Sequence, residues 1–271
     1  MRDTSSRLRI LHVWNTAGVG SVIAKFMDRK YGTDSLVITR KAADPVGITT
    51  YGKTLASGPW LFSGRALMMA RKFDIIHVHS LEGIVPWMKR IYMEKPVVLH
   101  YHGGEIRDRW EEKRKTWKQA DFVAYATPDM GEGAPEGIDW APNPVDTDIF
   151  RSDSSVRQEG TAVSIRYNMD DEAEGFAQRN GLKLSWIERK MVPHDEMPRL
   201  LQKSEYYLDF RRRLVDGKIV RCLGKAGLEA LACGCKVADW TGELHEGLPP
   251  VHLPDAVAER WHGIYERILE E

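Results

Sequence analysis

Short apolar runs alternate with amphipathic segments along the first half of the chain. Runs rich in β-branched residues predict buried strands at 8–14, 35–39, 74–79, 96–101 and 121–126. Apolar positions at helical spacing predict helices at 22–31, 63–72, 84–92 and 107–119. Because strands and helices follow one another in turn, the pattern predicts a doubly wound α/β domain, with a parallel sheet covered by helices on both faces.

The second half repeats this order in shortened form. Strands are predicted at 162–167, 182–187, 206–210 and 236–239, helices at 172–180, 196–202 and 223–232, and a closing amphipathic helix at 254–270. Between the halves, Pro142 and Pro144 hold the backbone extended, which suits a linker. The sequence therefore predicts an N-terminal domain over 1–145, a C-terminal domain over 146–253, and a helix over 254–271 that packs back toward the first domain.

The composition excludes several classes of protein. The 39 basic and 39 acidic side chains balance, so no overall positive field favours nucleic acid as a partner. No segment has the roughly 20 apolar residues that span a bilayer, and we expect a cytoplasmic protein, at most peripheral at the membrane. Cys222, Cys233 and Cys235 lack paired Cys-x-x-Cys spacing, which favours reduced thiols over a disulfide framework or a zinc ribbon.

The segment 96–107 carries the candidate reacting centre. His102, Gly103 and Gly104 directly follow the strand predicted at 96–101. Ligands of open α/β sheets bind beyond the carboxyl ends of the strands, so these residues are well placed to contact a substrate. Glu105 and Arg107, at the start of the helix expected next, are candidates for binding the acceptor. A core histidine followed by an ordinary turn is the competing interpretation.

A second candidate is Gly18-Val19-Gly20, between the strand at 8–14 and the first helix. A glycine turn at a helix N-terminus is a ready anion site. The third glycine and the acidic residue of a dinucleotide fingerprint are absent, so the turn does not predict NAD binding.

Two His-x-His pairs lie on adjacent predicted strands, His77 with His79 and His100 with His102. Alternate residues of a strand share a face, so a zinc cluster is conceivable. No carboxylate or cysteine lies at ligand spacing nearby, and we expect neither a metal nor another cofactor. Instead, we expect His79 and His102 to reach the crevice, with His77 and His100 packed deeper.

Four segments together resemble the large retaining glycosyltransferase family with the GT-B fold. Residues 74–79 with 96–107 are similar to its D-x-I-H-x-H and P-V-V-x-x-x-H-G strands, 140–150 to x-P-N-P-V-D-x-x-x-F, 192–210 to V-P-x-x-E-M-P-x-L-L, and 227–238 to L-E-A-x-A-C-G-x-P-V-V. The resemblance implies two facing Rossmann-like domains. It also implies transfer of a sugar from a nucleotide-sugar to an acceptor hydroxyl, retaining and metal-independent.

The resemblance also implies roles for individual residues. His102 would orient and polarise the sugar, and Gly18, Val19 and Gly20 would face the donor phosphates. In the second domain, Arg166 would stabilise the diphosphate and Glu229 would bind the ribose.

The chain departs from the family pattern around these residues. Arg221 stands where the family has its first glutamate, Ile165 replaces a glycine, and Asp171 or Glu172 replaces a lysine. One account is a changed donor pocket in which Arg211, Arg212, Lys218 or Arg221 takes over the phosphates. Another is a non-catalytic nucleotide-sugar or glycan-binding protein, and a third is a sugar-nucleotide epimerase of similar fold.

Two segments rich in basic and aromatic residues bear on what kind of acceptor the protein would use. They are Trp60-Leu61-Phe62 with Arg65, Arg71 and Lys72, and Trp87-Met88-Lys89-Arg90. They could lie on an anionic membrane that presents a lipid-linked acceptor, in place of a soluble glycan. The alternative is that each helix packs its apolar stripe on the sheet and leaves its basic residues solvated.

Overall fold

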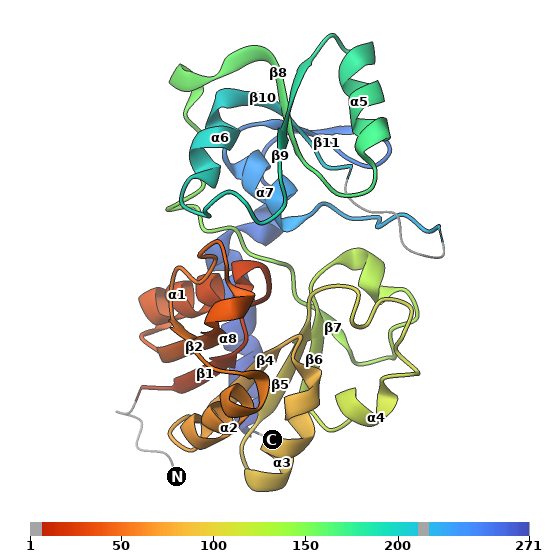
Figure 1. Cartoon of the computed structure of the whole chain (residues 1–271). Helices are drawn as coiled ribbons and strands as arrows, with labels where there is room; N and C mark the ends of the chain where they lie inside the picture. The colour runs from red at the N-terminus through yellow and green to blue at the C-terminus, as the bar shows by residue number, and fades with distance from the viewer. Residues whose placement is uncertain (1–6, 211–216, 271) are drawn as a thin grey trace. The chain divides into compact units, whose positions relative to one another are not determined.

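The computed structural model describes residues 7–210 and 217–270. Arg211 and Arg212, two candidates for the donor phosphates, lie outside the described residues. The chain divides into two compact units (Figure 1): unit 1 comprises Met1–Pro144 with Pro254–Glu271, and unit 2 comprises Val145–Leu253.

Unit 1 contains a parallel sheet in the order β3-β2-β1-β4-β5-β6-β7. Its strands are β1 (Arg9–Val13), β2 (Asp34–Arg40), β3 (Lys53–Leu55), β4 (Ile75–His79), β5 (Val97–Tyr101), β6 (Phe122–Tyr125) and β7 (Asp139–Trp140). The chain winds outward from β1 to β3 and then returns to place β4 on the other side of β1. The winding direction therefore reverses between β1 and β4, which is where ligands bind in such sheets.

Helices cover both faces of the unit 1 sheet. On one face, α1 (Val19–Tyr31) and α8 (Pro254–Glu270) share a core with Ile10, Ile75 and Val98 of the strands. On the other face lie α2 (Pro59–Ala70), α3 (Val85–Ile91) and α4 (Arg114–Trp117). The last helix of the chain thus completes the first unit, and Trp261 and Tyr265 of α8 are fully buried in it.

Unit 2 contains a sheet in the order β12-β11-β10-β8-β9, parallel except for the pair β11 and β12. Its elements are β8 (Gln158–Ile165), α5 (Asp170–Arg179), β9 (Lys183–Ile187), α6 (Met197–Lys203), β10 (Ser204–Leu208), α7 (Lys225–Ala232), β11 (Lys236–Ala238) and β12 (Leu244–His245). Here the winding reverses between β8 and β10.

Short 3₁₀ helices join several elements of both units: η1 (Thr16–Gly18), η2 (Lys41–Ala43), η3 (Glu82–Ile84), η4 (Pro128–Gly131), η5 (Ser154–Val156) and η6 (Pro250–His252). In the described part of the chain, no helix is both long enough and apolar enough to cross a membrane.

The predicted α/β class, the parallel sheet of unit 1 and the closing helix are confirmed. The sheet of unit 2 is parallel except for the antiparallel pair of β11 and β12, and one predicted helix is wrong. Residues 107–119 form turns, and only Arg114–Trp117 is α-helical. Asp108 has φ 60°, a left-handed conformation that an α-helix cannot include. The short strands β3, β7 and β12 were not predicted, because two or three residues are too few to show an alternating pattern.

Candidate active site

The carboxyl ends of β1 and β4 carry backbone strain. Trp14 directly follows β1 and has φ 75°, and Ser80 directly follows β4 and has φ 59°. Residues other than glycine avoid this region, at a cost of about 1–3 kcal/mol each. Hydrogen bonds hold both residues, from Trp14 N to Ile38 O (2.8 Å) and from Ser80 N to His100 O (2.9 Å). Strain of this kind clusters at functional sites, and here it coincides with the winding reversal of unit 1.

Glu105 organises the loop that follows β5. Its Oε1 accepts hydrogen bonds from Ser80 Oγ (2.7 Å), His102 N (2.6 Å) and Gly103 N (3.1 Å). Ser80 Oγ in turn accepts from Thr16 Oγ1 (3.0 Å). We expected Glu105 at the start of a helix, but it lies in a turn. Its carboxylate fixes the backbone on either side of His102.

Arg107 and Gly104, two candidates for binding the acceptor, differ in whether a ligand could contact them. Arg107 Nε donates to Asp129 Oδ2 at 2.9 Å, and the two side chains are 12% and 7% exposed. The guanidinium is therefore committed to a buried ion pair. Gly104 is exposed, and a Cβ at this position would meet no atom within 4 Å. Space for a ligand is thus found at Gly104 and not at Arg107.

Five histidines form one continuous group on the α8 side of the sheet. His12, His77, His79 and His100 are fully buried, and His102 is half-buried. Ring centroids of His77 and His79 are 4.1 Å apart, and those of His100 and His102 are 4.0 Å apart. The expectation that His79 reaches the crevice is wrong, because other imidazoles enclose it. His12 was not anticipated as a member of the group.

Hydrogen bonds connect three of these rings in a row. His12 Nδ1 lies 3.0 Å from His79 Nε2, His79 Nδ1 lies 3.0 Å from His102 Nε2, and His102 Nδ1 lies 3.3 Å from Asn143 Oδ1. An amide oxygen only accepts, so His102 Nδ1 carries the proton. In neutral rings, His79 Nδ1 then donates to His102 Nε2, and His12 Nδ1 donates to His79 Nε2. The row ends at His12 Nε2, which has no hydrogen-bond partner among the described residues.

Burial keeps these imidazoles neutral. Loss of hydration lowers the pKa of His12 to about 4, and it lowers the pKa values of His77, His79 and His100 well below the usual range. Burial also lowers the pKa of His102 to about 4, although the negative charge of Glu105 opposes the shift. At neutral pH, His102 therefore offers a neutral N–H donor and carries no charge.

The glycine turn before α1 has a structural reason for each glycine. Gly18 has φ 76°, and a Cβ there would lie 3.1 Å from Ile48 O. A Cβ on Gly20 would lie 3.1 Å from Asn15 Oδ1 and 3.2 Å from His79 Nε2. Gly18, Val19 and Gly20 are all buried, Val19 N–H donates to Thr16 O, and Ser21 N donates to Asn15 Oδ1 at 3.1 Å. Two of the first three backbone N–H groups of α1, those of Val19 and Ser21, therefore already donate to protein atoms and not to a phosphate.

Three groups in the described structure have the composition of a metal site. One ring nitrogen from each of His12, His77 and His79 lies within 4.8 Å of the others, as do nitrogens of His79, His100 and His102. Both groups need His79, whose two nitrogens already hold the row of imidazoles together. In unit 2, the third group comprises Asp239, Glu243 and His245. It is held internally, because Asp239 Oδ2 lies 3.0 Å from His245 Nε2.

In unit 2, Arg166 occupies the point where the winding reverses. It directly follows β8, and its guanidinium lies 4.4 Å from the centre of the Trp186 ring. Nε donates to Glu188 at 3.0 Å, and Nη1 donates to Asp170 at 3.3 Å. The side chain is 39% exposed, so it remains accessible from solvent. The position suits a diphosphate ligand, but two carboxylates already bind the cation.

Glu229 lies on α7 in a small charged group that includes two residues not anticipated as site residues. Lys225 Nζ lies 2.8 Å from Glu229 Oε1, and His194 Nε2 lies 3.9 Å from it. Burial acts to raise the pKa of Glu229, but Lys225 and His194 outweigh it and the pKa is lowered. Glu229 is therefore an ionised, buried carboxylate. The spacing of four residues on a predicted helix was the available sign that Lys225 pairs with it.

The remaining donor candidates, Lys218 and Arg221, lie in the segment 217–224 that leads into α7. Both side chains are exposed. The structure thus places Arg166, Glu229, Lys218 and Arg221 in unit 2, and it places His102, Gly103, Gly104, Glu105 and Arg107 around the carboxyl end of β5 in unit 1.

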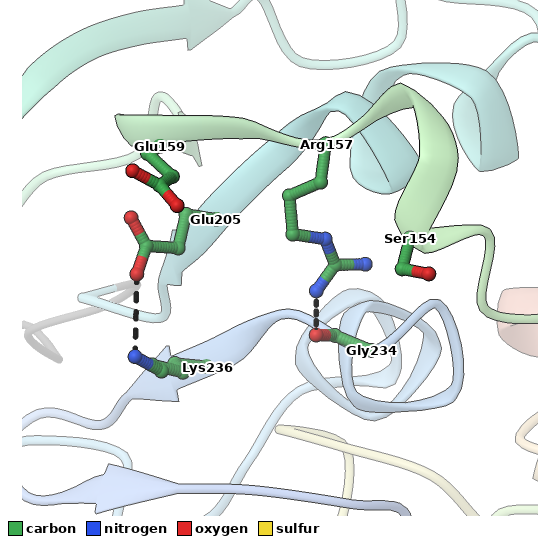
Figure 2. A pocket seen from close by; sticks show the side chains of 6 residues that line it. All are labelled: Ser154, Arg157, Glu159, Glu205, Gly234 and Lys236. Atoms are coloured by element: carbon green, nitrogen blue, oxygen red, sulfur yellow. Dashed lines mark hydrogen bonds and ion pairs between the residues drawn. The ribbon is translucent and has the colours of Figure 1, made fainter.

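A cavity of about 290 Å³ lies at the opposite, amino-terminal edge of the unit 2 sheet. Figure 2 shows its lining residues: Ser154, Arg157, Glu159, Glu205, Gly234 and Lys236. Glu205 Oε1 pairs with Lys236 Nζ at 3.2 Å, and Glu205 Oε2 accepts from Gly160 N at 2.7 Å. Arg157 donates to the carbonyl oxygens of Cys233 and Gly234. The cavity contains none of the predicted site residues.

Comparisons with known proteins relate the chain to a solved structure by fold, and not to any sequence. No family model and no curated protein sequence matches it. AviGT4, a glycosyltransferase involved in avilamycin A biosynthesis, aligns over 97% of this chain and 98% of its own with a TM-score of 0.63 and 15% identity. The calicheamicin glycosyltransferase CalG4 aligns over 97% of this chain and 92% of its own with a TM-score of 0.46 and 12% identity. The likeness to AviGT4 shows that the chain has the GT-B fold, which confirms the fold that the sequence motifs imply.

Proposed function

We propose that the protein is a glycosyltransferase that moves a sugar from a nucleotide-sugar donor to an acceptor hydroxyl. Unit 2 binds the donor, and unit 1 supplies the acceptor side and His102. The observation that carries the proposal is the charged group of Glu229, Lys225 and His194 together with Arg166, on segments that follow the carboxyl ends of the unit 2 strands. Ligands bind at this edge in open α/β sheets.

The charged residues suit the demands of the reaction. The bond between the anomeric carbon and the diphosphate oxygen breaks, and its electron pair leaves with the diphosphate. The acceptor oxygen bonds to the same carbon, in a retaining transfer on the same face, and its proton passes to the departing diphosphate. Fixed positive groups at the leaving group lower this barrier, each by about 2.7–4 kcal/mol in well-ordered sites. Arg166, Lys218 and Arg221 supply that charge here, and the chemistry requires no metal.

His102 acts on the sugar as a neutral donor. The row of imidazoles from His12 through His79 fixes the proton on His102 Nδ1, where Asn143 Oδ1 now accepts at 3.3 Å. A sugar hydroxyl replaces that long contact in the bound state. Gly103 and Gly104 leave room for the acceptor, Glu105 holds the loop, and Arg107 anchors it through Asp129.

Donor binding is tested by a thermal-shift screen against UDP-, GDP- and ADP-sugars. A donor present at 100 times its dissociation constant adds about 2.7 kcal/mol of stability. Arg166→Met should weaken binding of that donor about 10- to 100-fold, because a hydrogen bond to a charged group contributes about 1.5–3 kcal/mol. Arg179→Met, an exposed arginine in the last turn of α5, is the matched control and should bind as the wild type does. Equal affinity in both variants would contradict the proposal.

A second candidate function is a non-catalytic nucleotide-sugar or glycan-binding protein. It is favoured by the two carboxylates, Glu188 and Asp170, that hold the arginine meant for the diphosphate. Calorimetry with the donor, followed by an assay for transfer and for donor hydrolysis, separates the two. Binding without turnover toward any acceptor would support this candidate.

A further inference from the structure

Helix α2 is apolar on both of its sides. Phe62, Ala66 and Ala70 are buried against the unit 1 sheet. Trp60 is 90% exposed, Leu61 54% and Met68 71%. A helix that is apolar all round normally has both faces covered, and an ordinary surface helix carries polar residues on its outer side. The outer side of α2 therefore has the composition of a covered surface.

Helix α3 extends the same surface. Trp87 and Ile91 are one helical turn apart and are 56% and 53% exposed, and Met93 just beyond the helix is 76% exposed. The two helices lie on the same face of the sheet (Figure 1). Tyr92 Oη donates to Leu67 O at 2.6 Å, which joins the end of α3 to α2.

We call Trp60, Leu61, Met68, Trp87, Ile91 and Met93 the apolar face. It includes six of the seven large apolar side chains exposed on unit 1 among the residues that the structure describes, the seventh being Tyr51. Scattered exposed apolar residues are ordinary, but a concentration on two neighbouring helices marks an interaction surface.

Every charged residue of these two helices is basic. Arg65 lies on α2, Arg71 and Lys72 follow it, and Lys89 and Arg90 lie on α3. Lys89 pairs with Asp121 at 2.8 Å. Within the described structure, Arg65, Arg71, Lys72 and Arg90 form no ion pair, so four positive charges accompany the apolar face.

We propose that the apolar face docks unit 1 on an anionic lipid bilayer. Tryptophan and long aliphatic side chains enter the boundary between head groups and acyl chains, while arginine and lysine bind the lipid phosphates. A second copy of the chain is a poorer occupant, because the same face on a partner would bring like charges together. Delivery of a lipid-linked acceptor rests on the proposed transferase function, whereas the docking itself does not.

The test is flotation of the full chain with lipid vesicles. Wild-type protein should float with vesicles of equal parts phosphatidylcholine and phosphatidylglycerol, and much less with phosphatidylcholine alone. The triple variant Trp60→Ser, Met68→Ser, Trp87→Ser should lose at least about tenfold in bound fraction, because three apolar side chains no longer enter the bilayer. Arg71→Glu with Lys72→Glu should also reduce binding, and high salt should reduce wild-type binding. Met191→Ser, a change of one exposed side chain in unit 2, is the control and should bind as wild type does.

Three outcomes would overturn the proposal. The wild type could fail to float with anionic vesicles, or the triple variant could float as well as the wild type. Light scattering could instead show a dimer that the triple variant abolishes, which would assign the face to a second copy. All replaced side chains are exposed, so the variants should keep the wild-type circular dichroism and Tm. Donor binding measured without lipid reports separately on the proposed function.

Discussion

At the scale of single residues, the buried charge of Glu229 determines which substitutions around it unit 2 can accept without losing stability. Its side chain is 7% exposed, and Lys225 provides the nearest positive charge. Removing one partner of a buried ion pair costs about 3–5 kcal/mol, because it leaves the other charge buried and uncompensated. Lys225→Met should therefore lower the free energy of unfolding by about that amount, measured by denaturant titration.

The matched control removes both charges. Lys225→Met combined with Glu229→Gln should recover most of the stability that Lys225→Met loses, because no uncompensated charge remains. The double variant should nevertheless bind the donor nucleotide more weakly than the wild type if Glu229 holds the ribose. A double variant as unstable as the single one would show that Lys225 contributes through packing and not through charge.

The second residue-scale prediction concerns His102. His102→Ala removes the only N–H donor of the imidazole row that points toward Asn143, and transfer should fall about 10²- to 10³-fold. The variant also leaves His79 Nδ1–H without its acceptor, which should lower stability by about 1–3 kcal/mol. Asn143→Ala is the comparison, since it removes the contact but keeps the donor. Near-wild-type turnover of His102→Ala would remove His102 from the mechanism.

The sequence allowed His102 to be predicted as a site candidate but did not reveal how it is held. Its place followed from a strand, a histidine and two glycines, which is a local pattern. His12 lies some 90 positions earlier, and its role depends on β1 pairing with β4, a long-range contact that no local pattern shows. The commitment of Arg107 to Asp129 depends in the same way on the fold.

At the scale of elements, three adjacent strands make the core of unit 1 sensitive to acid. Four histidines on β1, β4 and β5 are fully buried with pKa values below the usual 6.5, that of His12 being about 4. In an unfolded chain these histidines become protonated near pH 6.5, whereas in the folded unit they stay neutral at that pH. Stability is therefore fully present above about pH 6.5 and is lost as the pH falls toward 4.

Urea unfolding at pH 7.5, 6.0 and 5.0 measures this loss. Each histidine that titrates only in the unfolded chain contributes about 1.4 kcal/mol per pH unit. Replacing His77 and Tyr265 together by phenylalanine removes one titrating ring and its hydroxyl partner, and it should flatten the pH dependence. A stability that does not change between pH 7.5 and 5.0 would contradict the prediction.

Elements differ in how far the sequence predicts them. The long strands and α8 carry enough alternating or helical positions to be recognised, and the observed bounds of α8 match the predicted 254–270. Helix α1 begins three residues earlier than predicted, because its first turn is the buried glycine segment. The segment 107–119 has the composition of a helix but forms turns. Trp110 and Trp117 pack into the core there, and each indole N–H donates to a backbone carbonyl.

At the scale of the whole molecule, α8 joins the end of the chain to its beginning. Its buried side chains include Val257, Trp261, Ile264, Tyr265 and Ile268. Burying each large apolar side chain contributes about 1.5–3 kcal/mol, so together they contribute about 10 kcal/mol, as much as a typical domain has in net stability. Deleting 254–271 should therefore unfold unit 1.

Hydrogen exchange read by mass spectrometry checks this prediction for each unit separately. Peptides from β1, β4 and β5 should lose protection in the truncated chain, while peptides from β8 and β10 should keep it. Removing only Glu270 and Glu271 is the control, because both follow the last buried residue of α8. Retained protection of β1 in the longer truncation would show that α8 is dispensable.

The return of the chain to unit 1 also sets an order of events during translation. Strands β1 to β7 leave the ribosome first, yet the part of the sheet face that α8 covers stays bare until residues 254–270 have been made. Unit 2 is synthesised without interruption and has all its residues before that moment. Unit 2 can therefore fold before unit 1, whose buried histidines lack the cover of Trp261 and Tyr265 until α8 has been made.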